Sequence, residues 1–141
     1  MDYQPRLAIG GWGESLALDR ARLQIFLDAL VQANVAILRA YPKLPRLYQS
    51  GVRYRSPEDQ CGGCDEDDPW ADALASLAAG YVDCEDAACW LAAERIVRDG
   101  IEAHVTARIT YDAGSQRQRI HVTVKSAAGD EDPALVLGMP G

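Results

Sequence analysis

The most informative stretch of the chain is residues 81–93, which read Tyr-Val-Asp-Cys-Glu-Asp-Ala-Ala-Cys-Trp-Leu-Ala-Ala. Asp83 is a suitable helix N-cap, and Asp86 stands three residues later, as in an acidic form of the capping box. Residues 87–93 are apolar in every direction around a helix, so its first turns are expected to be buried on all sides. The stretch therefore predicts a central buried helix that begins at Cys84.

Two more helices are predicted before this one. Apolar residues recur every three or four positions in a long amphipathic helix, which is expected to begin at residues 15–19 and to end before Pro42. A second helix is expected to start at Asp68 and Pro69, with Asp as N-cap and Pro at the first helical position. Gly80 is expected to end it.

The remainder of the chain alternates between apolar and polar residues, which is typical of strands. Residues 101–111 form one predicted strand and residues 120–124 mark a second, separated from it by a turn. A turn at 127–130 leads to a short last strand near 131–137. Helices followed by an antiparallel meander indicate an α+β fold, with helices packed on a small antiparallel sheet, in one domain over 1–141.

The charge of the chain is concentrated in one segment. The 141 residues include 14 basic and 21 acidic side chains, for a net charge of −7. Seven acids and no base lie between Glu58 and Asp72, and outside this stretch 14 acids balance 14 bases. An acidic chain is a poor candidate for nucleic-acid binding, which needs a basic footprint. Residues 43–68 hold no periodic pattern and are predicted to form a long acidic surface loop.

The sequence also bears on location and on the state of the cysteines. It has no run of 18 apolar residues, so neither a membrane span nor a membrane partner is expected. Residues 1–6 lack the features of a signal peptide, which favours a cytoplasmic protein whose thiols stay reduced. The cysteines are therefore candidates for metal binding, catalysis or packing. They are Cys61, Cys64, Cys84 and Cys89.

Cys61 and Cys64 form a Cys-Gly-Gly-Cys motif that leaves three interpretations open. A structural zinc site needs four ligands, which commonly come from two such pairs. Cys84 and Cys89 cannot easily supply the second pair, because residues five apart on a helix are separated by about 140°. A redox dithiol or a merely flexible Gly-Gly loop is therefore favoured over zinc, and no metal or cofactor is expected.

Cys84 is the candidate nucleophile. Its predicted place at a helix N-terminus, where free N–H groups and the helix dipole favour an anion, leads us to expect a depressed thiol pKa. The adjacent acids Asp83, Glu85 and Asp86 act in the opposite direction, so the helix terminus and a nearby imidazolium would have to outweigh them. The alternative is a small core residue with no chemical role.

The chain has two histidines from which a base could come. His104 lies on the polar face of its strand and is expected to be exposed, whereas His121 lies in mid-strand between β-branched residues. A following loop of two or four residues would place Asp132 on the same sheet face as His121, and an odd-length loop would not. With the shorter loop Asp132 lies opposite Thr123, a diagonal neighbour of His121. Cys84, His121 and Asp132 then have the order of a nucleophile, base and orienting carboxylate.

Three segments resemble the motifs of transglutaminase-like cysteine proteins: residues 81–86, His121-Val-Thr-Val over 121–124, and Glu-Asp-Pro over 131–133. Residues 48–54, Tyr-Gln-Ser-Gly-Val-Arg-Tyr, are similar to a segment of small stand-alone versions carried by bacteriophages and prophages. The resemblance covers roughly residues 45–139.

This resemblance implies a papain-like fold with Cys84 as nucleophile, His121 as base and Asp132 as orienting carboxylate. The implied activity is that of a cysteine hydrolase or acyltransferase that attacks peptide or isopeptide amides through a thioester. The alternative is a non-catalytic phage or prophage structural or binding module that retains the fold. Expected partners are protein or peptide substrates and phage structural proteins, in the cytoplasm of a bacterial host or on a virion. An acidic loop bordering the groove would favour basic or Lys-bearing substrates.

Overall fold

The computed structural model describes residues 16–56, 70–112 and 117–140. The elements in chain order are α1 (Leu16–Ala40), the 3-10 helix η1 (Leu47–Gln49), β1 (Arg53–Tyr54), α3 (Ala73–Ala79), β2 (Tyr81–Val82), α4 (Cys84–Val97), β3 (Ala103–Asp112), β4 (Arg117–Ser126), β5 (Gly129–Glu131) and α5 (Pro133–Val136). Helices accompany a small antiparallel sheet, which confirms the predicted α+β class.

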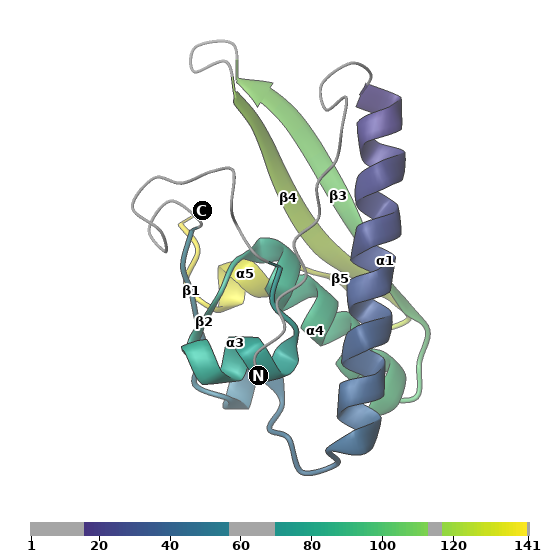
Figure 1. Cartoon of the computed structure of the whole chain (residues 1–141), viewed down its shortest axis with the longest axis vertical. Coiled ribbons are helices and arrows are strands. Elements are labelled where there is room, and N and C mark those ends of the chain that lie inside the picture. The colour runs from purple at the N-terminus through teal and green to yellow at the C-terminus, as the bar shows by residue number, and fades with distance from the viewer. Residues whose placement is uncertain (1–15, 57–69, 113–116, 141) are drawn as a thin grey trace.

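Helix α4 is the centre of the fold. Figure 1 shows it between α1 and the β3–β4 hairpin on one side and the smaller elements β1, β2 and α5 on the other. Every residue from 87 to 93 is buried, as its apolar sequence predicts. The Asp83 side chain accepts a hydrogen bond from the backbone N–H of Asp86 at 3.0 Å, so the helix begins at Cys84 as predicted.

Helix α1 covers one side of the core and runs beside the hairpin (Figure 1). One of its faces is buried, including Leu27, Val31 and Leu38. Gln24 donates a side-chain hydrogen bond of 3.0 Å to the backbone carbonyl of Val105, on the edge strand β3. This contact satisfies an edge carbonyl that no neighbouring strand reaches.

Among the described residues, one stretch is long and apolar enough to cross a membrane. It is Arg20–Ala40 in α1, with a mean hydropathy of 1.3. The core helix of a soluble protein passes the same test, and the buried face of α1 is that of a core helix. The stretch is therefore weak evidence for a membrane span.

The sheet has the strand order β3-β4-β5 and is antiparallel throughout. Its face toward the helices carries buried apolar residues such as Val105, Val122 and Val124. Ser126 pairs with Gly129, so a two-residue turn joins β4 to β5. This is the shorter of the even-length loops considered above, and it determines where the chain goes after Glu131.

The structure corrects the start of the second helix. Helix α3 begins at Ala73, and its N-cap is Asp72, whose side chain accepts from the backbone N–H of Ala75 at 2.9 Å. Asp68 and Pro69, the predicted start, lie outside the described residues. Gly80 ends the helix as predicted, with a φ of 85° that favours glycine.

The long loop predicted over 43–68 is wrong for its first part. Residues 47–49 form η1, and β1 pairs in parallel with β2, which leads into α4. A two-residue strand is too short to leave an alternating pattern, so this pairing has no signal in the sequence. The rest of the predicted loop, from residue 57 on, lies outside the described residues.

The last predicted strand, 131–137, is also wrong. Strand β5 ends at Glu131, and Asp132 is the N-cap of α5, with Pro133 at the first helical position. The Asp132 side chain accepts a hydrogen bond from the backbone N–H of Leu135 at 3.4 Å. An Asp-Pro pair starts a helix more readily than it continues a strand, because proline cannot donate to the ladder.

Candidate active site

Cys84 occupies the first position of α4 and faces the edge of β4. Its Sγ contacts the carbonyl oxygen of Ile120 at 3.5 Å, and the backbone of Val122 also hydrogen-bonds to the sulfur. Strand β5 pairs with β4 only from Val124 to Ser126, so the sulfur lies against the part of this edge that β5 leaves uncovered. The thiol is therefore held against backbone groups on both sides of His121.

His121 and Asp132 form a direct pair. The imidazole Nε2 lies 2.7 Å from Oδ2 of Asp132, and the two side chains are 33% and 24% exposed. The ladder pairs Val124 with Glu131, so the next residue, Asp132, follows on the side of Thr123 and His121. The structure thus confirms the predicted approach of Asp132 to His121.

The pairing also determines the tautomer of neutral His121. With Nε2–H donating to the Asp132 carboxylate, Nδ1 carries the lone pair that can accept a proton. Nδ1 is bonded to the ring carbon nearest the backbone, so it is the ring nitrogen closer to the strand that Sγ touches. Within the described part of the chain, no hydrogen bond joins Sγ of Cys84 to the His121 ring.

The expected depression of the Cys84 pKa is wrong for this structure. Burial, which leaves the residue 8% exposed, raises the thiol pKa well above its ordinary value. Glu85 raises it further, by its charge and through an Sγ–Oε2 contact of 3.3 Å, while the hydrogen bond from Val122 lowers it. The resting sulfur is therefore a protonated thiol, because the free helix N-terminus does not offset burial and a neighbouring carboxylate.

An ion-pair network that the sequence did not predict holds the segment that carries Asp132. Arg95 of α4 binds Glu131 with Nε to Oε2 at 2.9 Å and Nη2 to Oε1 at 2.5 Å, and it also binds Asp99 at 2.8 Å. Asp99 is bound in turn by Arg46 at 2.9 Å. Since Glu131 directly precedes Asp132, the network connects α4 to the strand end from which the carboxylate projects. No spacing rule joins residues 95 and 131, so only the fold brings them together.

Two further groups near this network are perturbed by burial. Glu94 is 2% exposed and accepts a hydrogen bond from the backbone N–H of Leu47, and burial raises its pKa. Partial burial, together with the charge of Glu131, raises the pKa of Tyr48 to about 12. The α4 side chains thereby hold the segment that carries Tyr48 close to the end of β5.

Two other residues singled out from the sequence, His104 and Cys89, do not join this site. His104 is exposed, as predicted, and lies opposite Lys125. Cys89 is a buried free thiol whose Sγ contacts the Leu27 carbonyl at 3.6 Å. Cys61 and Cys64 lie outside the described residues. Among the residues that are described, no cluster of three or more His, Cys, Asp or Glu side chains could hold a metal ion.

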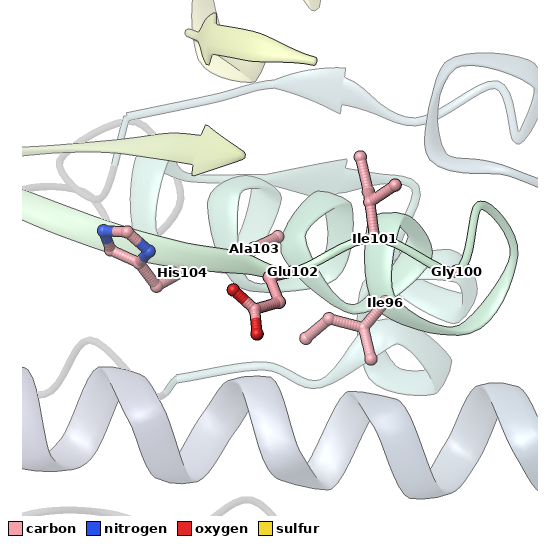
Figure 2. Close-up of a pocket in the computed structure, with 6 residues that line it drawn as sticks. All are labelled: Ile96, Gly100, Ile101, Glu102, Ala103 and His104. Carbon is pink, nitrogen blue, oxygen red and sulfur yellow. The ribbon is translucent and has the colours of Figure 1, made fainter. Parts of the chain in front are cut away.

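A surface hollow of about 550 Å³ lies at the far end of α4. Figure 2 shows its lining, which comes from the end of α4, the following loop and the start of β3: Ile96, Gly100, Ile101, Glu102, Ala103 and His104. Ile96 is twelve residues after Cys84 on one helix, which corresponds to about 18 Å along the axis. The hollow is therefore separate from the Cys84 site.

In comparisons with known proteins, no family model, curated protein or solved structure matches this chain.

Proposed function

We propose that the chain is a cysteine hydrolase or acyltransferase of papain-like, transglutaminase-like fold, acting on peptide or isopeptide amides with Cys84, His121 and Asp132. One observation carries the proposal: the His121–Asp132 pair at 2.7 Å is formed beside a helix N-terminal cysteine whose sulfur contacts the strand on both sides of His121. A nucleophile at a helix start and a histidine oriented by a carboxylate are the components that thiol catalysis needs.

Each residue has a defined role in the proposed reaction. Asp132 holds the His121 ring with Nε2 protonated, and Nδ1 takes the proton from the Cys84 thiol as sulfur attacks the carbonyl carbon. The carbonyl electron pair moves to oxygen, where the proposed hydrogen-bond donor is the backbone N–H of Cys84, which has no intrahelical partner at the first helical position. The carbonyl then reforms, the C–N bond breaks, and the proton on Nδ1 passes to the leaving amine.

The resulting thioester is resolved by a second nucleophile. Attack by water, with His121 as general base, regenerates the thiol and releases an acid, which is hydrolysis. Attack by a primary amine regenerates the thiol and forms a new amide, which is acyl transfer. Both outcomes use the same three residues.

The buried thiol sets a condition on this reaction. The resting thiol is protonated and has Glu85 as a neighbour, so substrate binding must bring Sγ and Nδ1 together before the proton moves. Catalytic hydrogen bonds are commonly longer without substrate than in the reacting complex. We therefore expect reactivity to depend on His121 rather than on a preformed thiolate.

The test is labelling with a peptide-based vinyl sulfone, which reacts with catalytic cysteines, followed by mapping of the labelled peptide by mass spectrometry. We expect the label on Cys84. Labelling should be lost in Cys84→Ala, strongly slowed in His121→Ala and retained in Cys89→Ala. Labelling that survives Cys84→Ala, or that His121→Ala leaves unchanged, contradicts the enzymatic proposal.

A second candidate function is a non-catalytic phage or prophage structural or binding module. The 8% exposure of Cys84 and its contact with Glu85 favour this alternative, because both oppose thiolate formation. Absence of vinyl sulfone labelling, together with stable capture of a phage structural protein, would support it.

The proposed substrates are proteins or peptides, with basic or Lys-bearing segments favoured by the acidic residues between Glu58 and Asp72. The proposed location is the cytoplasm of a bacterial host or a virion.

A further inference from the structure

One cation lies directly opposite the candidate base. Arg108 of β3 pairs in register with His121 of β4, so the two side chains project from the same face of the sheet. Directly opposite residues have Cβ atoms about 4.5–5.5 Å apart. The next pair along this face, Thr106 and Thr123, has its hydroxyl oxygens 3.3 Å apart, so side chains of opposite residues do meet here.

Arg108 has no acidic partner among the described residues. It is exposed, and in the described part of the chain its guanidinium makes no ion pair and no hydrogen bond. Arg46 and Arg95, by contrast, are bound by carboxylates. The carboxylate of Asp132, which lies beside His121, is already engaged by the imidazole.

Another cation on this face, Lys125, lies farther from the candidate base and has an acidic neighbour. Lys125, four residues from His121 along β4, lies opposite Asp130 of β5, so its charge has an acidic neighbour. At about 3.3 Å per residue, Lys125 is roughly 13 Å from His121 along the strand. Among the described residues nothing engages Arg108, so its donors are free at the position directly opposite the candidate base.

We propose that Arg108 is a specificity-determining residue that binds a carboxylate carried by the substrate next to the reacting amide. A guanidinium offers two parallel N–H donors that match the two oxygens of a carboxylate, and an uncharged amide cannot replace that interaction. The inference rests on the proposed function and adds a substrate class to it: acyl donors with an acidic side chain beside the attacked carbonyl. A basic group in the leaving portion is compatible with it.

The experiment compares two alkylating reagents that differ in charge. The 141-residue chain is treated separately with iodoacetate and iodoacetamide in 0.15 M salt, where charges beyond about 8 Å are screened. The rate of modification of the Cys84 peptide is followed by mass spectrometry, and the readout is the ratio of the iodoacetate rate to the iodoacetamide rate. Vinyl sulfones with glutamate or glutamine beside the reactive group form a second matched pair.

Two ratios are compared between variants: the iodoacetate rate over the iodoacetamide rate, and the rate of the glutamate vinyl sulfone over that of the glutamine one. In Arg108→Gln both ratios are expected to fall about threefold, which is the effect of losing an exposed ion pair. Arg108→Glu is expected to lower both ratios further. Lys125→Gln removes the same charge from the same face at a distance, and its ratios are expected to match those of wild type. Arg108→Lys keeps the charge without the planar fork and is expected to give intermediate values. Circular dichroism of each variant checks that it is folded.

The failures of the two proposals are distinguishable. If His121→Ala slows both reagents at Cys84 while Arg108→Gln leaves both ratios unchanged, the role of Arg108 is overturned and the proposed function stands. An equal fall in Lys125→Gln also overturns it, since any cation on the face would then suffice. If Cys84 reacts with none of the reagents, or if its reaction does not depend on His121, the proposed function fails and the specificity inference fails with it.

Discussion

Arg95 and Glu131 form a two-point ion pair between the central helix and the last strand, with Nε–Oε2 at 2.9 Å and Nη2–Oε1 at 2.5 Å. The two side chains are only 18% and 22% exposed, so solvent screens the pair less than it would a surface pair. Glu131 is the last residue of β5, and Asp132 follows it. The position of the carboxylate that orients His121 is therefore linked to α4, the helix that begins with Cys84.

We expect Arg95→Ala to lower the free energy of unfolding by about 1–3 kcal/mol, because it leaves Glu131 partly buried without its charged partner. It should also slow the His121-dependent alkylation of Cys84, since the end of β5 loses its anchor. Arg98→Ala is the matched control, because Arg98 lies on the same helix end and binds only the Tyr41 carbonyl among the contacts described. Urea unfolding and alkylation rates measure the two effects; equal losses in both variants would contradict a special role for Arg95.

Glu94 makes the stability of the protein depend on pH. Its pKa is raised by burial, so the folded state holds the proton more tightly than the unfolded state does. The contribution of Glu94 is therefore fully present below the ordinary carboxyl pKa and is lost as the pH rises through the folded-state pKa. The difference in unfolding free energy between Glu94→Gln and wild type should shift in favour of the variant from pH 4.5 to pH 8. A difference that stays constant, or that shifts toward wild type, would disprove this assignment.

Glu85 should lower the reactivity of the Cys84 thiol. Its charge and its contact with Sγ both raise the thiol pKa, second in size only to burial. In Glu85→Gln we expect the alkylation rate of Cys84 at pH 7.5 to rise by up to about tenfold, which is the effect of one pKa unit. Glu102→Gln, an exposed acid at the distant hollow, should leave the rate unchanged. A slower reaction in Glu85→Gln would mean that the carboxylate assists the thiol.

Asp83 caps the helix that carries Cys84, and removing this cap should lower the free energy of unfolding. Asp83→Ala removes the acceptor for the backbone N–H of Asp86 and is expected to cost about 0.5–2 kcal/mol. Asp83→Asn keeps an acceptor oxygen at that place and should retain most of the stability. Thermal and urea unfolding of the pair would settle the point, and equal destabilisation by both substitutions would show that the charge rather than the cap is what matters.

The parts of the fold that the sequence predicted are those governed by local periodicity. The apolar run from residue 87 to 93 and the Asp83 cap placed α4 correctly, and strict alternation identified the β3–β4 hairpin. The parts that it missed are short elements that exist only through distant partners. Strand β1 is recognisable only when it is paired with β2. At Asp132 the alternating pattern predicted that the strand continues, whereas the chain starts a helix there.

The candidate site also combines features that local sequence patterns predict with features that depend on distant contacts. The order Cys84, His121 and Asp132, and the place of the thiol at a helix start, follow from sequence alone because capping and alternation act over a few residues. The meeting of His121 with Asp132 required the two-residue turn, since one residue more would have turned Asp132 to the other face. Only the tertiary structure decided the protonated state of the Cys84 thiol and the anchoring of Glu131 by Arg95. Burial and long-range ion pairing depend on which surfaces the fold brings together, and no local pattern encodes them.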